Sequence, residues 1–454
     1  MSGRFVSMDR DTGYLLPPSV QEWLPKDHLA RFVAEIVEQL DLRALTTAYR
    51  GRGSEAFHPA MMVSVLFYGY ATGVYSSRQL ERATYDSVAM RYLAANQHPD
   101  HDTIAHFRRR FLKELSALFV QLLGVARQMG MLKVGKVSLD GTKVHANASK
   151  HSALSWEHAC KIEAQLKAEV EQLLRWAEAA DQAAIPDGMS VPEELRRRED
   201  RLAAIAQAKA EIEARAAERH AREQAAYEQK MAERKAKEAT TGRKPGGTPP
   251  AAPTAGPEPT DQVNLTDADS RIMPTAGGGF EQAYNAQAAV DVTTMLIVAQ
   301  HVTQNANDKQ EVKPTLDHLD AVAPVIGKID ALIADNGYLS AGNVDACHER
   351  QVEPYIAAGR QAHHPPLAER LQGVEPLAEG ASAVDRMRFR LQTPEGREVY
   401  GKRKCTVEPT FGIIKSVLGF RQFLLRGLQA VQHEWTLVCM GWNLKRLHRL
   451  RLAA

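Results

Sequence analysis

The sequence has few cysteines and no long apolar run, and both shortages exclude classes of protein. Its four cysteines are Cys160, Cys347, Cys405 and Cys439, and none forms a C-x-x-C pair. Such isolated cysteines do not match zinc-ligand spacing and are typical of free thiols in a reducing compartment. The most apolar stretch, Ala60–Val74, is too short and too interrupted to span a bilayer. The N-terminus also lacks the apolar run of a signal peptide, so we expect a cytoplasmic protein without membrane contact.

The chain lacks net charge overall but not locally. The formal net charge is +2 across 454 residues, and apolar and charged contents of 44% and 25% are those of a globular protein of two to four domains. From Arg386 to the C-terminus, however, 14 Lys and Arg residues face only 4 Asp and Glu residues. A basic segment in a near-neutral protein indicates a polyanionic partner, and the alternative is a solvated basic tail.

Residues 1–130 are predicted to form an all-helical N-terminal domain. Ser76 and Gln79 have the spacing of a capping box, which predicts the start of a short helix. Asp102 is placed to cap one long helix that ends at Gly130.

The predicted long helix carries consecutive basic residues: Arg108, Arg109, Arg110 and, one turn later, Lys113. Short helices followed by a basic helix are compatible with a helix-turn-helix-like DNA reader, in which these side chains contact DNA. A plain helical bundle with a basic face is the alternative.

An insertion of different character follows. Residues 150–239 read as two helices with heptad-like apolar spacing, although Lys209 occupies a seam position. We expect them to form an antiparallel helical hairpin. Residues 240–262 are rich in proline and glycine and are predicted to be a flexible linker.

The rest of residues 131–454 alternates between strand and helix patterns. Without the insertion, the order is strand, strand, strand, helix, strand, helix, strand, helix, which predicts an α/β domain with a mixed sheet flanked by helices. The expected strands are 131–145, 281–292, 295–302, 328–334 and 353–357, the helices are 308–322, 340–350 and 406–450, and 361–395 is expected to be irregular.

Three carboxylates occupy special positions in this pattern. Asp140 and Asp335 each end a short apolar run, and Glu408 begins an amphipathic helix. If the two strands pair, the aspartates become neighbours at the sheet edge where α/β folds place catalytic groups. Carboxylate oxygens hold Mg²⁺ or Mn²⁺, and two such ions can clamp the attacking and leaving oxygens of a phosphodiester. We therefore expect the three carboxylates to converge.

Each carboxylate also has a simpler interpretation. Asp–Gly and Asp–Asn–Gly sequences commonly form turns, and an acid in the first turn of a helix is favoured by the helix dipole. The basic residues around Glu408 favour a phosphate site over a surface salt bridge, because a helix salt bridge does not explain so many cations. They are Lys402, Arg403 and Lys404 before Glu408 and Lys415 two turns after it, and Tyr400 precedes the cluster.

Five motifs spread along the chain occur together. They are Asp140–Gly–Thr–Lys143 with Ala146–Asn147, Tyr284–Asn–Ala–Gln287 with Asp291, Ala334–Asp–Asn–Gly–Tyr338, Val407–Glu408 with Phe411 and Lys415, and the tail from Glu434 to Leu447. Together with the helical region from Phe57 to Phe111, they resemble the DDE transposases of bacterial insertion sequences, which are RNase H-like polynucleotidyl transferases.

The resemblance implies a site and a reaction. It assigns the catalytic, metal-binding triad to Asp140, Asp335 and Glu408, with two Mg²⁺ ions that Mn²⁺ can replace. The family's tyrosine–arginine–glutamate–lysine signature falls on Tyr400, Arg403, Glu408 and Lys415, while Lys404 rather than Arg403 has the family's spacing from the glutamate. The candidate DNA contacts near the triad are therefore Lys143, Tyr400, Arg403, Lys404 and Lys415.

The implied reaction is hydrolysis at the ends of a transposon, followed by transfer of the freed 3′-hydroxyl to target DNA. The partner is double-stranded DNA, bound by a homodimer. Two alternatives stay open: a metal-dependent nuclease of the same fold that does not join strands, and a non-enzymatic DNA-binding regulator.

Overall fold

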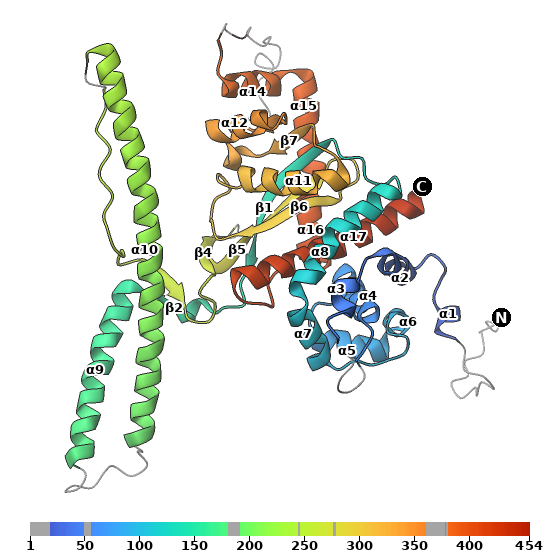
Figure 1. Cartoon of the computed structure of the whole chain (residues 1–454), viewed down its shortest axis with the longest axis horizontal. Helices are drawn as coiled ribbons and strands as arrows, with labels where there is room; N and C mark the ends of the chain where they lie inside the picture. The colour runs from blue at the N-terminus through green and yellow to red at the C-terminus, as the bar shows by residue number, and fades with distance from the viewer. Residues whose placement is uncertain are drawn as a thin grey trace, which may run out of the picture. The chain divides into compact units, whose positions relative to one another are not determined.

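The computed structural model describes residues 19–49, 56–179, 191–243, 246–275, 278–359, 377 and 380–454. The chain forms two compact units, one of Met1–Val144 with Asn285–Ala454 and one of His145–Tyr284. Figure 1 shows their helices and the single large sheet. No helix among the described residues has the length and apolar content that a membrane span requires.

The N-terminal part of the first unit is helical, as predicted. Ser76 caps a helix as expected, since its Oγ accepts a hydrogen bond from the backbone N–H of Gln79 at 3.2 Å. The prediction of one long helix from Asp102 is wrong: Asp100 caps the helix, and Phe111 leaves helical geometry and divides it in two. The helices are α1 Val20–Trp23, α2 Leu29–Gln39, α3 Arg43–Thr46, α4 Pro59–Thr72, α5 Ser77–Asp86, α6 Val88–Leu93, α7 His101–Arg110 and α8 Leu112–Gln128.

A six-stranded mixed sheet confirms the predicted mixed α/β architecture. Its main path runs β4-β5-β1-β7-β8, and β6 also pairs with β5. β1, β7 and β8 are parallel, whereas β4 and β6 run antiparallel to β5. The strands are β1 Lys136–His145, β4 Arg271–Pro274, β5 Phe280–Asp291, β6 Ile297–Thr303, β7 Ala331–Ala334 and β8 Glu353–Ile356.

Helices flank the sheet, and two predictions about them are corrected. Part of 361–395, expected to be irregular, is helical where the structure describes it, because Ser382 and Thr393 cap successive helices there; residues 361–376 lie outside the described residues. The expected helix over 406–450 is interrupted by a π-helical turn, Ile413–Val417, and a loop that ends at Gly427. The helices are α11 Val312–Ile326, α12 Ala341–Glu349, α14 Ala383–Gln392, α15 Pro394–Gly401, α16 Val407–Gly412 and α17 Leu428–Ala453.

The last helix, α17, binds the backbone of strand β6 through its side chains. The Asn443 side chain accepts from the N–H and donates to the carbonyl of Ile297, both at 2.8 Å. Gln432 accepts from the N–H of Val302 at 2.6 Å. Polar groups at a strand edge are costly to leave unpaired, so these bonds fix α17 against the sheet.

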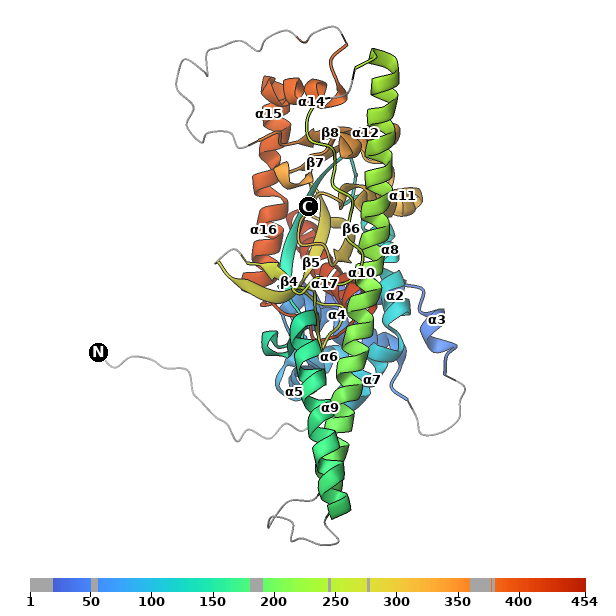
Figure 2. The same ribbon diagram turned by 90° about the vertical axis from the view of Figure 1, so that its left-hand side faces the viewer.

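The second unit contains the predicted helical hairpin. α9 (Trp156–Ala179) and α10 (Val191–Thr241) pack antiparallel, as Figures 1 and 2 both show. Lys209 is accommodated in the apolar seam because its ammonium pairs with Glu163 at 2.7 Å and lies over the ring of Trp156. The loop between the helices lies outside the described residues.

A two-stranded sheet joins the ends of this insertion. β2 (Ala153–Ser155) pairs antiparallel with β3 (Gln262–Asn264). The last residues of the segment predicted to be a flexible linker are held to the hairpin. The Asp261 carboxylate forms an ion pair with Arg219 at 2.6 Å. Its backbone carbonyl accepts a hydrogen bond from the N–H of Trp156 at 2.8 Å.

The structure predicts a pH-dependent stability that centres on Glu434 of α17. Its carboxylate is fully buried and accepts from the N–H groups of Leu424 and Leu425, and burial raises its pKa from 4.5 to about 7. The unfolded chain ionises this group at lower pH than the folded chain, so its contribution to stability falls as pH rises from about 4.5 to about 7. We expect Glu434→Gln, which keeps the acceptor oxygen, to flatten the dependence of melting temperature on pH between 5 and 8. A parallel shift of the whole curve would contradict this.

Candidate active site

The register of two parallel strands places Asp140 beside Asp335. β1 pairs with β7 through Lys136↔Ala331 and Ser138↔Ile333, so continuing the register by two residues sets the aspartates opposite each other. β1 does not turn at Asp140 but runs on to His145, which excludes the simple turn interpretation of Asp140–Gly141. Asp335 follows β7 directly and opens a 3₁₀ turn, Asn336–Tyr338.

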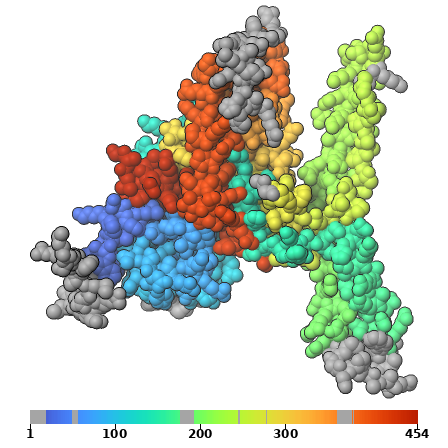
Figure 3. Space-filling view, turned by 180° about the vertical axis from the view of Figure 1, so that it is seen from behind, coloured from blue at the N-terminus to red at the C-terminus, as the bar shows by residue number. Residues whose placement is uncertain are grey.

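The third predicted carboxylate joins them around one guanidinium. Arg403 lies in a 3₁₀ turn, Lys402–Cys405, between α15 and α16. Figure 3 shows the part of the chain that carries these elements in orange. The Nη2 of Arg403 is 2.9 Å from Asp140 Oδ2 and 3.6 Å from Asp335 Oδ2, and its Nη1 is 2.7 Å from Glu408 Oε1. All three carboxylates therefore contact one guanidinium, which lies between them.

Burial and neighbouring charge set the electrostatics of this cluster. Burial raises the pKa of Asp140 to about 6, and the charges of Asp335 and Asp308 act in the same direction. The Arg403 guanidinium and the N–H of Gly141, which donates to Asp140 at 2.8 Å, oppose that rise. Since the side chains of Asp335 and Glu408 are 41% and 47% exposed, solvent or a ligand reaches the cluster from their side.

Two lysines flank the cluster. The Lys415 ammonium donates to the carbonyl of Lys143 at 2.6 Å, and burial lowers its pKa, as do the charges of Lys143 and Arg421. The Lys143 ammonium lies 3.8 Å from Asp308. Two cations held close together beside acids can bind a group with several negative oxygens, such as a phosphate.

Comparison with known families agrees with this geometry. A family model described as "Transposase DDE domain" matches residues 260–444, and one described as "Transposase domain (DUF772)" matches residues 18–110. The chain belongs to the DDE transposases of insertion sequences. The first match includes Asp335, Arg403 and Glu408 of this transposase, whereas Asp140 precedes it. No curated protein and no solved structure matches the transposase at a significant level.

The three carboxylates of the transposase are suitable ligands for a divalent metal ion. The three side chains offer only carboxylate oxygens, which suit Mg²⁺ and Mn²⁺, and a cationic guanidinium already occupies the position between them. Among the described residues, no three acidic, histidine or cysteine side chains are gathered closely enough to hold an ion as they stand. Because the Arg403 guanidinium lies between the three carboxylates, its side chain must move away before all three can bind one ion.

The structure separates the candidate basic residues of the signature. Arg403, only 13% exposed, faces the carboxylates, while the adjacent Lys404 is exposed and makes no ion pair with any described residue. Tyr400 is half-buried, and burial raises its pKa, opposed by the nearby Arg403. The residue that lies within the acidic cluster is thus Arg403, even though Lys404 has the family's spacing.

One candidate DNA contact in the N-terminal helices is corrected. Arg108 is buried, with its guanidinium bonded to the Tyr70 hydroxyl at 3.2 Å and the Tyr75 carbonyl at 3.0 Å, so it cannot contact DNA in this conformation. Arg109 and Arg110 are exposed. The correction follows from the period of α7, since consecutive helical residues cannot all face solvent.

Sequence reasoning also missed a fourth acid near the cluster, Asp308. Its Oδ1 lies 2.6 Å from where a Cβ on Gly141 would stand. Gln287, which belongs to the motif that begins at Tyr284, lies beside Asp308 and donates a hydrogen bond to it. No signal in the sequence distinguished Asp308, because it occupies a loop without a recognised motif.

The same close approach explains the glycine after Asp140 and yields a prediction. A Cβ at Gly141 would lie 2.2 Å from Gln287 Nε2 and 2.9 Å from Asn285 Oδ1. We expect Gly141→Ala to lower stability by about 1–3 kcal/mol, the usual cost of overpacking, measured as a lower melting temperature. Gly342→Ala is the control, because no atom lies within 4 Å of its added Cβ. Equal melting temperatures for both variants would refute the crowding.

Proposed function

We propose that this transposase hydrolyses the phosphodiester bond at each end of its mobile element and joins the freed 3′-hydroxyl to target DNA. One observation carries the proposal: carboxylates from β1, the β7 turn and α16 meet around one guanidinium in a chain with a transposase DDE domain. The mixed sheet with flanking helices is consistent with an RNase H-like catalytic fold.

We propose that Asp140, Asp335 and Glu408 hold two Mg²⁺ ions, which Mn²⁺ can replace. Bound ions would supply Lewis-acid stabilisation of the attacking and leaving oxygens. The protein's part is to hold the carboxylates on rigid elements and to place cations for the phosphates. Arg403 offsets part of the negative charge of the carboxylates in this structure, and it becomes available to a phosphate once other cations replace it there.

We assign DNA contact to basic groups and one tyrosine near the cluster, and to basic groups in the N-terminal helices. Phosphate contacts from lysine and arginine give affinity that does not depend on base sequence. Residues 1–130 would recognise the element's ends, and 131–454 would act as the catalytic domain, interrupted by the hairpin (150–239) and the linker (240–262). The proposed contacts are Lys143, Tyr400, Arg403, Lys404, Lys415, Arg109 and Arg110.

An element has two ends, and one copy of the cluster serves one phosphodiester at a time. We therefore propose that two copies of the chain act together on double-stranded DNA, in the cytoplasm where chromosomal DNA is accessible. Light scattering of the protein with and without end DNA measures this stoichiometry, and a 1:1 complex competent in joining would refute it.

The test uses a linear duplex carrying the DNA segments that flank the coding sequence. Incubation with the full chain and Mg²⁺ should yield nicked or cut ends and, with a target plasmid, joined products. Cleavage without any joining would indicate a nuclease. Binding without cleavage in either Mg²⁺ or Mn²⁺ would indicate a DNA-binding regulator and would refute the proposed activity.

A further inference from the structure

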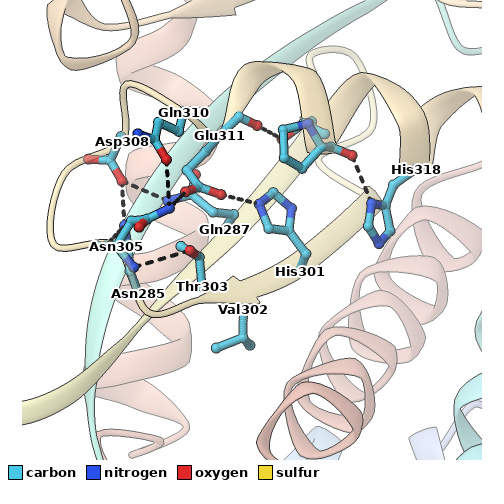
Figure 4. Close-up of polar contacts among 12 residues, drawn as sticks. Asn285, Gln287, His301, Val302, Thr303, Asn305, Asp308, Gln310, Glu311 and His318 are labelled. Atoms are coloured by element: carbon cyan, nitrogen blue, oxygen red, sulfur yellow. Dashed lines mark hydrogen bonds and ion pairs between the residues drawn. The ribbon is translucent and has the colours of Figure 1, made fainter. Parts of the chain in front are cut away.

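A fourth carboxylate, Asp308, lies beside the acidic cluster and has no role in the function proposed above. It belongs to the loop between β6 and α11. Its Oδ1 accepts hydrogen bonds from Asn285 Nδ2 and Gln287 Nε2, both at 2.7 Å, as Figure 4 shows. The two amides are two residues apart on β5, hence on the same face of the sheet. With the Lys143 ammonium at 3.8 Å, one oxygen faces three donors from two neighbouring strands.

The Gln287 amide continues this network to the other strand of the site. Its Oε1 accepts the hydroxyl hydrogen of Tyr338 at 2.5 Å, and Tyr338 is fully buried in the turn that begins with Asp335. A glutamine amide can bind with either end, but a carboxylate accepts only. Asp308 therefore holds the NH₂ end, and the oxygen is left for Tyr338.

The loop that carries Asp308 is itself held firmly. Glu311, whose N–H donates to the Asp308 carbonyl, accepts from His301 Nε2 and Asn305 Nδ2 at 2.8 Å each, and Figure 4 shows these contacts. Asn343 of α12 donates to the carbonyls of Lys309 and Tyr338 at 2.8 and 2.7 Å. The same helix therefore ties the Asp308 loop to the Asp335 turn.

Asp308 also lies close to the backbone of both catalytic aspartates. A Cβ on Gly141, next to Asp140, would stand 2.6 Å from its Oδ1, and a Cβ on Gly337, in the Asp335 turn, would stand 3.9 Å from its Oδ2. Within the described part of the chain, Oδ2 accepts no hydrogen bond, so Asp308 is anchored through one oxygen only.

We propose that Asp308 is a positioning residue: it orients the Gln287 amide and the Lys143 ammonium, and so fixes the Asp335 turn beside Asp140. The inference rests on the proposed phosphodiester chemistry. Groups that orient the ligands of a metal site usually change affinity or activity by about 10–100-fold when they are lost. Asp308 acts without touching the substrate, through the hydrogen bonds that join it to Gln287 and, through Gln287, to Tyr338.

The experiment compares the wild type with Asp308→Ala in single-turnover cleavage of the duplex that carries the flanking segments. Mn²⁺ affinity by electron paramagnetic resonance, duplex affinity and melting temperature are measured alongside. We expect cleavage and Mn²⁺ affinity to fall about 10-fold or more, with duplex affinity within about twofold because phosphate contacts dominate it. Asp320→Ala, which removes a half-exposed carboxylate from α11, is the matched control and should leave all four unchanged.

A charge exchange keeps the test valid if the alanine variant folds poorly. In Gln287→Glu, two carboxylates face each other and cleavage should fall by a similar factor. Adding Asp308→Asn gives the new carboxylate an amide donor in place of Asp308, with its other oxygen left for Tyr338. The double variant should recover most of the loss, and a merely structural role predicts no such recovery.

Two results overturn this inference alone: wild-type rate and Mn²⁺ affinity in a folded Asp308→Ala, or a double variant no better than Gln287→Glu. A wild-type protein that neither cleaves DNA nor binds Mn²⁺ would overturn the proposed function, and this inference with it.

Discussion

Asp335→Asn is expected to abolish cleavage while leaving DNA binding nearly intact. Asp335 lies opposite Asp140 in the parallel register, and its carboxylate is part of the proposed metal site. The substitution preserves shape but removes a ligand charge. A metal ion supplies several kcal/mol of transition-state stabilisation, and each 1.36 kcal/mol is tenfold in rate, so the loss should be about a thousandfold.

The measurement is single-turnover cleavage in Mg²⁺ together with binding of the same duplex. Binding should stay within about twofold because lysine and arginine contacts to phosphate dominate it. Asp345→Asn, at an exposed carboxylate on α12, is the control and should cut at the wild-type rate. If Asp335→Asn cuts comparably to the wild type, Asp335 is a turn residue and the triad is wrong.

Arg403→Gln should change metal binding and cleavage in opposite directions. The single positive charge of the guanidinium contacts three carboxylates at once in this structure. Without it, the acids repel one another until a divalent cation replaces the charge. We expect a lower melting temperature without metal, a larger stabilisation by Mn²⁺, and Mn²⁺ affinity raised about tenfold or more, as one lost competing ion pair implies.

Cleavage by Arg403→Gln should nevertheless fall, because a cation that can bind phosphate is gone. Arg397→Gln on α15 is the control, since Arg397 is exposed and makes no ion pair with a described residue. It should leave melting temperature and Mn²⁺ affinity at wild-type values. Reduced Mn²⁺ affinity in Arg403→Gln would show that the arginine supports the metal site rather than competes for it.

The central geometry could be predicted because it depends on local patterns. Apolar runs that end in Asp140 and Asp335 predict strands, and parallel pairing of such strands brings their ends together. The apolar period of the residues after Glu408 predicts a helix that begins there. The mixed sheet and the helical hairpin followed from the same kinds of pattern.

Other features depend on contacts between distant segments, which no local pattern encodes. Nothing near Arg403 in the sequence shows that it faces all three acids while Lys404 faces solvent. The run of basic residues predicts DNA contact for Arg108, but Tyr70 and Tyr75 provide polar partners for it inside the helical region. Asp308 gains its position only from a loop held by Glu311 and Asn343.

The wide separation of the cluster's members along the chain makes the site late to assemble. Arg403 and Asp140 are 263 positions apart in sequence, yet their side chains touch. During synthesis the hairpin can fold from local contacts, whereas the acidic cluster must wait for the segment that carries Arg403 and Glu408. A nascent or truncated chain that stops before α16 therefore lacks a member of the proposed triad. Such a chain could occupy DNA through its earlier basic residues without being able to cut it.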